Sequence, residues 1–447
     1  MIPTILLAAY GAVLIGIALA SLKYSHSIEN FLVAGRKQRK LFVVASMLAS
    51  TIGGGITIGT VSKAVNMGFP AFWFVAAGGI AHFLQGIFLS RKVRESEALT
   101  MPDLAGGFLG PQNRLLVSAI IVVTWTGLAA AQFVAAAKVI TTLTGLAHQP
   151  AVAVAAAFLV VYTLIGGQKS VLRTDLFQFG ILALALVGTL AWLFLAKPPA
   201  PGALEIELFN AGFKPLDLVY YVVVVGGSYL ICPMMFSRVL SSDSPANARR
   251  SSFVSGAGMF LFAFAITFVG LWAKASGLDS GGLDPLNAIA AKVLPPALGV
   301  ALVMGLLAAI LSTGDTVLIT AASVFEHDVL KRDRVNGVRF WIVAVGVVAA
   351  LVALFSTDII GLILKTYNGY TAGIVPALFV ALVLGKGRKM NPALAFAGIV
   401  IGYALGTAGS FQAAASPWSK LLPMAGLASS AALSLAAAFV KPVSKTK

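Results

Sequence analysis

The chain has 447 residues, of which 59% are hydrophobic and only 11% are charged, and its mean hydropathy is +0.93. A water-soluble protein of this length cannot cover its surface with so few charged side chains, so most of the chain must face lipid or other helices. The net charge of +16 is typical of nucleic-acid binding, but the positions of the basic residues give a different explanation.

Apolar runs long enough to cross about 30 Å of hydrocarbon as helices recur along the whole chain. They predict an all-α integral membrane protein of about thirteen transmembrane helices, at 3–22, 41–62, 69–90, 115–142, 149–166, 175–196, 217–237, 252–274, 295–325, 338–356, 359–384, 391–408 and 420–440. The first run lacks preceding basic residues and a convincing cleavage site, so we interpret it as a membrane helix. The longest hydrophilic stretches, 91–114, 197–216 and 238–251, are loop-sized, which predicts one membrane domain over residues 1–447.

Most of the basic residues fall on one side of the membrane when the predicted spans cross it in turn. With the N-terminus outside, the cytoplasmic side receives the Lys and Arg of 23–40, 91–114, 169–173, 238–250, 331–339, 386–389 and 441–447. The outside receives Lys63, Lys197, Lys214, Lys274, Lys292 and Lys420, while Lys138 and Lys365 lie within spans. This bias follows the positive-inside rule. It predicts the lipid bilayer as the partner instead of nucleic acid, a cytoplasmic C-terminus and, with short external loops, a bacterial inner membrane.

Glycine clusters interrupt the second and seventh runs. They are Gly53-Gly54-Gly55 and Gly226-Gly227, and Pro233 follows the second. Glycine weakens a helix by about 1 kcal/mol and proline by about 3 kcal/mol, so these positions favour helix breaks. Runs two and seven are five apart, which predicts a 5+5 inverted repeat of helices 2–6 and 7–11 with discontinuous helices 2 and 7. The alternative is that the glycines only allow close helix packing.

Run nine carries a stripe of hydroxyl side chains. At 100° per residue, one arc of about 100° contains nearly all the hydroxyls of this otherwise apolar helix. Its members are Ala309, Ser312, Thr313, Thr316, Thr320 and Ser323. The stripe favours an ion or water path, and the alternative is hydrogen bonding to the helix's own carbonyls or to neighbouring helices. On run two, Ser46, Ser50, Gly53, Thr57 and Thr60 share one face if the segment is helical throughout.

Two acidic residues, Asp175 and Asp315, lie in or at the end of a span. A charge in hydrocarbon is costly, so each is a candidate functional residue. Asp175 is alternatively a helix N-cap or a partner of Arg173, and Asp315 lies about 60° from Ser312 around the helix. Other polar residues within spans are candidates for a cavity or for interhelical hydrogen bonds, namely His82, Gln85, Trp125, Gln132, Tyr229 and Cys232.

The sequence shows no enzymatic constellation and no phosphate-binding glycine loop. We therefore predict that the chain is not an enzyme and does not use ATP. An ion gradient is the expected energy source.

Several motifs, in their order and spacing, resemble the sodium:solute symporter family. They are Phe31-Leu32-Val33-Ala34-Gly35-Arg36, the Ala49 to Gly59 segment, Arg94 to Asp103, Ala130-Ala131-Gln132, Tyr162 to Gly167 with Thr174-Asp175 and Gln178, Phe236-Ser237-Arg238 with Ala248-Arg249, and Ala308 to Thr313. The resemblance implies a leucine-transporter-type fold with one added N-terminal helix. It divides the chain into a helix and loop at 1–40, repeats at 41–196 and 217–384, and two C-terminal helices at 391–447.

The resemblance also implies a site for Na⁺, the expected coupling ion. Its ligands are the backbone carbonyls of Ala49, Ile52 and Ala309 with the hydroxyls of Ser312 and Thr313. These are neutral oxygens, which suit a hard monovalent cation. Asp175 matches a family aspartate linked to sodium coupling and, in some members, to a second ion, for which Thr316 is a further candidate.

The solute site departs from the sugar-carrying members of this family. Thr51 stands where those members place an amide, and Ile56 is apolar where they offer another, so a sugar would lose hydrogen bonds worth about 1 to 3 kcal/mol each. A small carboxylate-bearing solute, an amino acid or monocarboxylate, is favoured. The predicted solute-binding residues are Ser50, Thr51, Gly53, Gly54, Thr57, His82, Gln132 and Tyr229.

These observations predict a sodium-coupled symporter that imports a small organic solute by alternating access, with no obligatory protein partner. The alternatives are a proton-coupled symporter with Asp175 or Asp315 as the carrier, a sugar or vitamin symporter, and a transporter-like solute sensor. A channel is disfavoured because no ring of like charges or filter sequence is visible.

Overall fold

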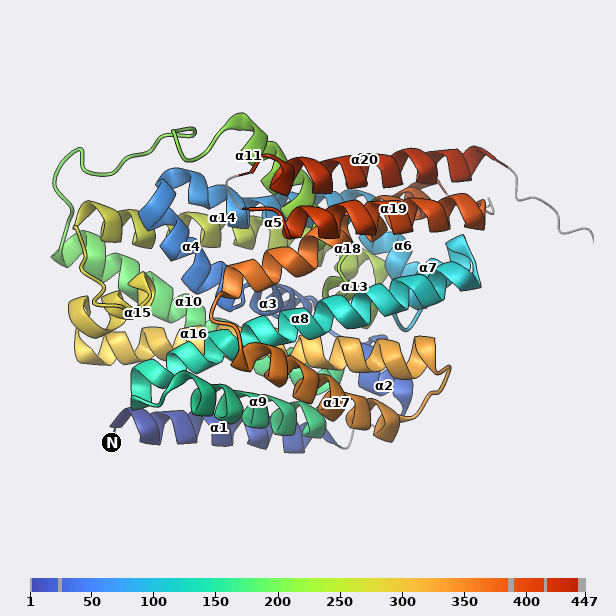
Figure 1. Cartoon of the computed structure of the whole chain (residues 1–447). Coiled ribbons are helices and arrows are strands. Elements are labelled where there is room, and N and C mark those ends of the chain that lie inside the picture. The colour runs from blue at the N-terminus through green and yellow to red at the C-terminus, as the bar shows by residue number, and fades with distance from the viewer. Residues whose placement is uncertain (1, 23–25, 385–389, 414–415, 441–447) are drawn as a thin grey trace, which may run out of the picture.

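A computed structural model describes residues 2–22, 26–384, 390–413 and 416–440, although not the side chains of 2–7 and 360. Helices make up nearly all of this part of the chain, which contains no β-strand. Most of the long helices run roughly parallel or antiparallel to one another and form a single bundle (Figure 1). The predicted all-α class is confirmed.

Most predicted runs become single long helices. They are α1 (Ile2–Ser21), α5 (Phe72–Phe88), α8 (Pro111–Thr144), α9 (His148–Ile165), α10 (Gln168–Ala191), α14 (Pro245–Ala275), α16 (Pro296–Val324), α17 (Val335–Leu354), α18 (Ile359–Leu384), α19 (Pro392–Ser410) and α20 (Trp418–Phe439). Run two forms α3 (Lys40–Thr51) and α4 (Gly54–Met67), and run seven forms α11 (Pro215–Tyr220), α12 (Gly226–Leu230) and α13 (Pro233–Ser241). The remaining short helices are α2 (Ile28–Val33), α6 (Ser90–Glu95), α7 (Met101–Leu109) and α15 (Pro285–Ala288).

The predicted count of thirteen spans is not confirmed. Among the described residues, ten helices are long and apolar enough to cross a membrane, and the two bent pairs bring the number to at most twelve. The run predicted at 3–22 corresponds to α1, a helix of 20 residues.

Both predicted helix breaks are present. The α3–α4 pair bends by 54° and the pair formed by Pro215–Leu230 and Pro233–Ser241 bends by 43°. The second break lies at residues 231–232, after the glycines, because Pro233 cannot continue the preceding helix and begins α13 instead. Gly226 allows close packing, since a Cβ atom there would lie 3.0 Å from the Ala77 carbonyl oxygen of α5.

Two of the predicted loops contain helices that a hydropathy average overlooks. Stretch 91–114 holds α7, whose N-cap Thr100 accepts a hydrogen bond of 3.1 Å from the Asp103 amide. Stretch 238–251 holds the start of α14, which Ser244 caps by accepting from the Asn247 amide at 3.2 Å. Such caps stabilise polar helix ends, which extend beyond the apolar runs.

The helices lie in a definite order across the bundle. Helix α1 lies on one side, and α19 and α20 pack together on the opposite side (Figure 1). Between them, α3 contacts α10, α13, α14 and α16, and α16 contacts α8, α9 and α10. The broken helices therefore lie in the interior, where neighbouring protein can satisfy the freed backbone groups.

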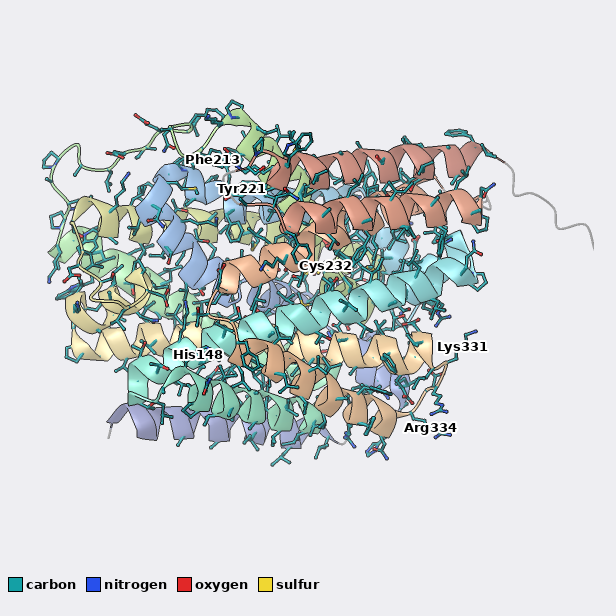
Figure 2. All side chains as sticks on the ribbon, in the orientation of Figure 1. His148, Phe213, Tyr221, Cys232, Lys331 and Arg334 are labelled. Atoms are coloured by element: carbon teal, nitrogen blue, oxygen red, sulfur yellow. The ribbon has the colours of Figure 1, made fainter. Side chains whose placement is uncertain are left out.

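Loops assigned to the same side of the membrane contact one another. Lys274 pairs with Glu205 at 2.6 Å, and Lys420 pairs with Asp217. At the other end of the bundle, Arg94 Nε donates to the Ser242 carbonyl oxygen at 2.7 Å, and Figure 2 places Lys331 and Arg334 at one end of the bundle. Some predicted cytoplasmic residues lie outside the described residues: Lys23, Lys386, Arg388, Lys389, Lys441, Lys445 and Lys447. Which end faces the cytoplasm stays a prediction.

Candidate ion and solute site

The α3–α4 break frees backbone groups inside the bundle. Ile52 and Gly53 leave the helical conformation, with φ and ψ of −89° and 68° at Ile52 and −88° and −170° at Gly53. The Gly54 amide donates to Gln132 Oε1 of α8 at 3.2 Å, and not to a backbone carbonyl oxygen of α3 as it would in a continuous helix. The carbonyls at the C-terminal end of α3 are therefore available to other partners.

Two hydroxyls of α16 meet these freed carbonyls. Ser312 Oγ lies 2.9 Å from the Ala49 carbonyl oxygen and 3.0 Å from that of Ala309. Thr313 Oγ1 lies 3.2 Å from the Ser50 carbonyl oxygen and 3.0 Å from that of Ala309. The five oxygens form one compact, neutral and buried cluster.

This cluster fits a desolvated sodium ion. Backbone carbonyls at a helix break together with hydroxyls are the ligands that Na⁺ takes in transporters with broken helices. Four of the predicted ligands, Ala49, Ala309, Ser312 and Thr313, supply oxygens that lie together here. Ile52 is fully buried at the break itself, so its predicted role remains consistent with its position.

A small cavity adjoins the oxygen cluster. Thr313 and five of the predicted solute-binding residues line it, namely Ser50, Thr51, Gly53, Gln132 and Tyr229. The cavity has a volume of about 20 Å³, which is room for roughly one water molecule. A solute therefore requires the surrounding helices to move apart.

The other three predicted solute-binding residues are not among the residues that line this cavity. Gly54 donates its amide to Gln132. Thr57 Oγ1 donates to the Gly53 carbonyl oxygen, one turn away, at 3.1 Å. His82 is buried on α5 and places its Nδ1 2.8 Å from the Gly78 carbonyl oxygen of its own helix. This contact lies within its own helix, so it matches neither the predicted solute-binding role of His82 nor the interhelical alternative.

Sequence reasoning missed several residues that line the cavity. They are the apolar and aromatic side chains of Phe74, Leu128, Ile363 and Tyr367, whereas Ile56, which also lines the cavity, is a position that the sequence analysis considered. The rings of Tyr229 and Tyr367 meet edge to face with 6.1 Å between their centroids. Tyr367 follows an apolar stretch of α18, and no periodicity within that run distinguishes it from an ordinary packing residue.

The assignment of Arg238 to a cytoplasmic loop is wrong. The residue lies in α13, and its side chain is fully buried. Its Nη2 lies 3.3 Å from Asp175 Oδ2, 2.7 Å from Ser50 Oγ and 2.6 Å from Thr316 Oγ1. Hydropathy places Arg238 just beyond run seven, but the helix break redirects α13 into the interior.

Asp175 is neither an N-cap nor a partner of Arg173. It lies seven residues inside α10, is fully buried, and forms its ion pair with Arg238. Ser46 Oγ also donates to its Oδ2. Asp315 is equally buried and accepts from Thr316 Oγ1 at 3.1 Å. The two acids of the spans therefore belong to one buried polar cluster, which adjoins the oxygen cluster through Ser50 and Thr316.

The hydroxyl stripe of α16 continues past this cluster. Thr320 and Ser323 line a second small space between α7, α10, α13 and α16, together with Gln168 and Ser237. Apolar side chains, among them Leu32, Met101 and Ile319, line most of the rest of this space, so the predicted ion or water path along the stripe stays a prediction.

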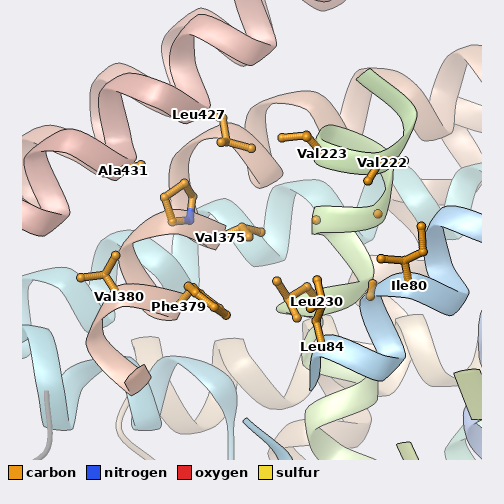
Figure 3. Close-up of a pocket in the computed structure, with 14 residues that line it drawn as sticks. Ile80, Leu84, Val222, Val223, Leu230, Val375, Phe379, Val380, Leu427 and Ala431 are labelled. Carbon is orange, nitrogen blue, oxygen red and sulfur yellow. The ribbon is translucent and has the colours of Figure 1, made fainter. Parts of the chain in front are cut away.

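A larger pocket lies elsewhere and is wholly apolar. Figure 3 shows it between α5, α12, α18 and α20, with Leu84, Leu230, Phe379 and Leu427 among its side chains. Its volume is about 310 Å³. It offers no polar side chain to orient a charged solute, so it does not compete with the cavity beside α3 as a solute site.

Comparison with known proteins points to the family that the sequence motifs resemble. A model of the sodium:solute symporter family matches residues 31–198. The high-affinity choline transporter 1 of Caenorhabditis elegans is 27% identical over 378 residues, which cover 75% of this chain and 63% of that protein. The sodium/proline symporter of Escherichia coli (strain K12) is 24% identical over 437 residues, covering 90% of this chain and 86% of that protein.

A solved structure shows the fold. The Na⁺-coupled sialic acid symporter, in a substrate-bound outward-open state, is 15% identical and aligns with a TM-score of 0.77 over 100% of this chain and 99% of that one. Two broken helices five runs apart, packed around buried oxygens, are thus features of a leucine-transporter-type fold.

Within this fold, the chain is similar to the sodium:solute symporter family, whose model matches residues 31–198. The matching family model and the two relatives carry the names of transporters, in agreement with the predicted transport function. The family model and the sodium/proline symporter are both named for sodium, which supports the prediction of Na⁺ as coupling ion.

Proposed function

We propose that this chain is a sodium-coupled symporter that imports a small carboxylate-bearing solute, an amino acid or a monocarboxylate, by alternating access. The observation that carries the proposal is the approach of Ser312 and Thr313 to the carbonyls freed at the α3–α4 break. Because one ligand set comes from α3 and the other from α16, Na⁺ bound between them would hold the two helices together. Opening the cytoplasmic side would then require release of the ion.

The solute site adjoins the ion site directly. Thr313 belongs to the oxygen cluster and also lines the cavity, and so does Ser50, whose carbonyl oxygen is part of the cluster. A solute carboxylate would face the N-terminal end of α4, where the amides of the first turn and the helix dipole favour an anion. The two sites share residues, and Na⁺ and the solute carboxylate carry opposite charges. Each ligand should therefore raise the affinity of the other, commonly by about 1 to 3 kcal/mol.

The aromatic lining favours an amino acid within this class. Phe74, Tyr229 and Tyr367 surround the cavity, and aromatic faces attract an ammonium group. Two relatives carry names that fit such chemistry, a sodium/proline symporter and a choline transporter. A monocarboxylate would leave these rings without a cationic partner.

Orientation and location are part of the proposal. The N-terminus is outside, the C-terminus is cytoplasmic, and the membrane is a bacterial inner membrane. The positive-inside distribution supports this arrangement.

The test is uptake into proteoliposomes of labelled proline, other amino acids, monocarboxylates, choline and sugars, each with and without an inward Na⁺ gradient. We expect uptake of an amino acid that depends on Na⁺ and that Thr313→Ala weakens. A pH gradient that drives uptake equally well without Na⁺ would contradict the proposal in favour of proton coupling. Choline or sugar uptake alone would retain the coupling but overturn the solute class.

A further inference from the structure

Three arginines from two helices line one hollow of the protein surface. They are Arg91 of α6 and Arg249 and Arg250 of α14, and Glu95 and Phe253 lie beside them. The hollow has a volume of about 580 Å³. The positive-inside rule predicts that both helix ends lie on the cytoplasmic side. That rule requires the basic residues to stay on one side of the membrane, but it does not require them to gather in one hollow.

The protein does not balance the charges of this hollow. Arg91 pairs with Glu95 at 2.8 Å. The Arg249 Cζ atom lies 5.6 Å from the centroid of the Phe253 ring, and within the described part of the chain neither Arg249 nor Arg250 has a carboxylate partner. Three basic side chains and one acidic side chain of the described lining leave an excess of two positive charges. The hollow therefore attracts an anion.

Other acidic side chains at this end of the bundle do not supply that anion. Asp103 and Asp328 both pair with Arg114, at 2.9 Å and 2.8 Å. Asp243, which precedes α14, is not among the residues that line the hollow, and its Oδ1 accepts from Asn247 Nδ2 at 2.7 Å. A partner for the two arginines of α14 would thus be a separate molecule.

An apolar stripe of α14 leads away from the hollow. Val254, Leu261 and Phe264 are exposed, and at roughly 100° per residue they share one face of the helix with Arg250. From Val254 to Phe264 the stripe is about 15 Å long, since a helix rises by about 1.5 Å per residue. This length is the depth of one leaflet, half of a hydrocarbon core of about 30 Å. A molecule whose anionic group lies at Arg250 could therefore place apolar chains along the stripe.

We propose that the hollow between α6 and α14 binds the phosphate of an anionic glycerophospholipid, whose acyl chains lie along the apolar stripe. Guanidinium groups donate paired hydrogen bonds to phosphate oxygens, and basic pockets beside membrane helices on the cytoplasmic side suit anionic head groups. The stripe favours a lipid over a free phosphate ion, which has no apolar part. Because α6 and α14 both line the hollow, the bound lipid would hold these two helix ends together. The proposal does not depend on which solute is carried.

The test is binding of tritiated dioleoyl-phosphatidylglycerol to the purified full-length protein in detergent, measured by scintillation proximity. Unlabelled dioleoyl-phosphatidylglycerol should compete at least about tenfold more effectively than dioleoyl-phosphatidylcholine, which has the same chains but a head group without net charge. Arg249→Ala with Arg250→Ala should weaken binding by about 30-fold, the effect of two arginine charges near an anionic head group. Arg332→Ala with Arg334→Ala is the matched control, because these two exposed arginines are predicted to lie on the same side and do not line the hollow.

Equal competition by the two lipids would overturn the proposal. An equal loss of binding in the two double variants would also overturn it, because the effect would then follow net charge and not the hollow. Inorganic phosphate in large excess, at an ionic strength matched with chloride, should leave the lipid bound; displacement would assign the hollow to a free anion instead. If Arg249→Ala with Arg250→Ala does not give monodisperse protein, Arg250→Ala alone decides: a loss of about fivefold supports the lipid site, and unchanged affinity contradicts it.

Discussion

At the scale of single residues, Ser312 and Thr313 carry the proposed sodium site. Each hydroxyl lies near two backbone carbonyl oxygens, one of α3 and one of α16. Removing either one deprives a buried cation of a ligand, and we expect a cost of about 1 to 3 kcal/mol. Ser312→Ala and Thr313→Ala should therefore raise the Na⁺ concentration for half-maximal uptake by roughly 5-fold to 150-fold.

The measurement is the Na⁺ dependence of solute uptake in proteoliposomes. Ser434→Ala is the matched control, because Ser434 is an equally buried serine on α20, outside the site. An unchanged Na⁺ dependence in both site variants would show that the ion binds elsewhere.

Gly53 occupies a position with no space for a side chain. A Cβ atom there would lie 2.7 Å from Thr313 Oγ1 and 3.0 Å from Gln132 Oε1. Gly53→Ala should displace the Thr313 hydroxyl and reduce sodium-dependent uptake at least about tenfold, the effect of 1.4 kcal/mol. Gly180→Ala, where a Cβ atom meets nothing within 4 Å, should retain uptake. Normal uptake by Gly53→Ala would show that the Thr313 hydroxyl need not hold its observed position.

The residues of the site differ in how far the sequence predicts them. Helical periodicity alone places Ser312, Thr313 and Thr316 on one polar face, because the spacing of hydroxyls along a helix is a property of the linear sequence. Periodicity does not identify Arg238 and Tyr367 as interior site residues, because their positions depend on where a break redirects one helix and where another helix packs.

At the scale of helices, the second break depends on a tyrosine from a different helix. Tyr370 of α18 donates its hydroxyl to the Ile231 carbonyl oxygen at 2.5 Å. The break leaves this carbonyl without a helical partner, and both groups are buried. Tyr370→Phe should lower the free energy of unfolding by about 1 to 3 kcal/mol, because a buried acceptor loses its donor.

Thermal unfolding in detergent, followed by tryptophan fluorescence, checks this expectation. Tyr403→Phe is the comparison, since the Tyr403 ring packs against Gly369 and the change preserves the ring. A melting temperature of Tyr370→Phe equal to that of the unmodified protein would contradict the assigned role of the hydroxyl.

Helix existence was predictable, and helix ends were less so. Hydropathy identified the apolar runs, but α10 begins at Gln168 and not at residue 175. That difference moves Asp175 from a helix end into the interior, where its partner is Arg238. A hydropathy average does not detect polar helix turns that are stabilised by contacts with other helices.

At the scale of the whole molecule, the orientation in the membrane is testable with cysteine labelling. Cys232 is the only cysteine in the chain and is buried, so the native protein provides a weakly reactive background. A membrane-impermeant maleimide should label Lys292→Cys in right-side-out vesicles and Lys331→Cys in inside-out vesicles, because the positive-inside rule assigns these exposed positions to opposite sides. The reverse pattern would invert the proposed topology.

The sequence by itself determined the membrane class, the apolar helices, the two interruptions and the hydroxyl face of α16. These features arise from local composition and periodicity, which a bilayer and a helix impose directly. Only the tertiary structure decided that Arg238 enters the interior, that Asp175 and Asp315 share a cluster, and that Tyr367 reaches the cavity. Such contacts join segments far apart in the chain, and their geometry depends on how bent helices pack, a property that no local pattern contains.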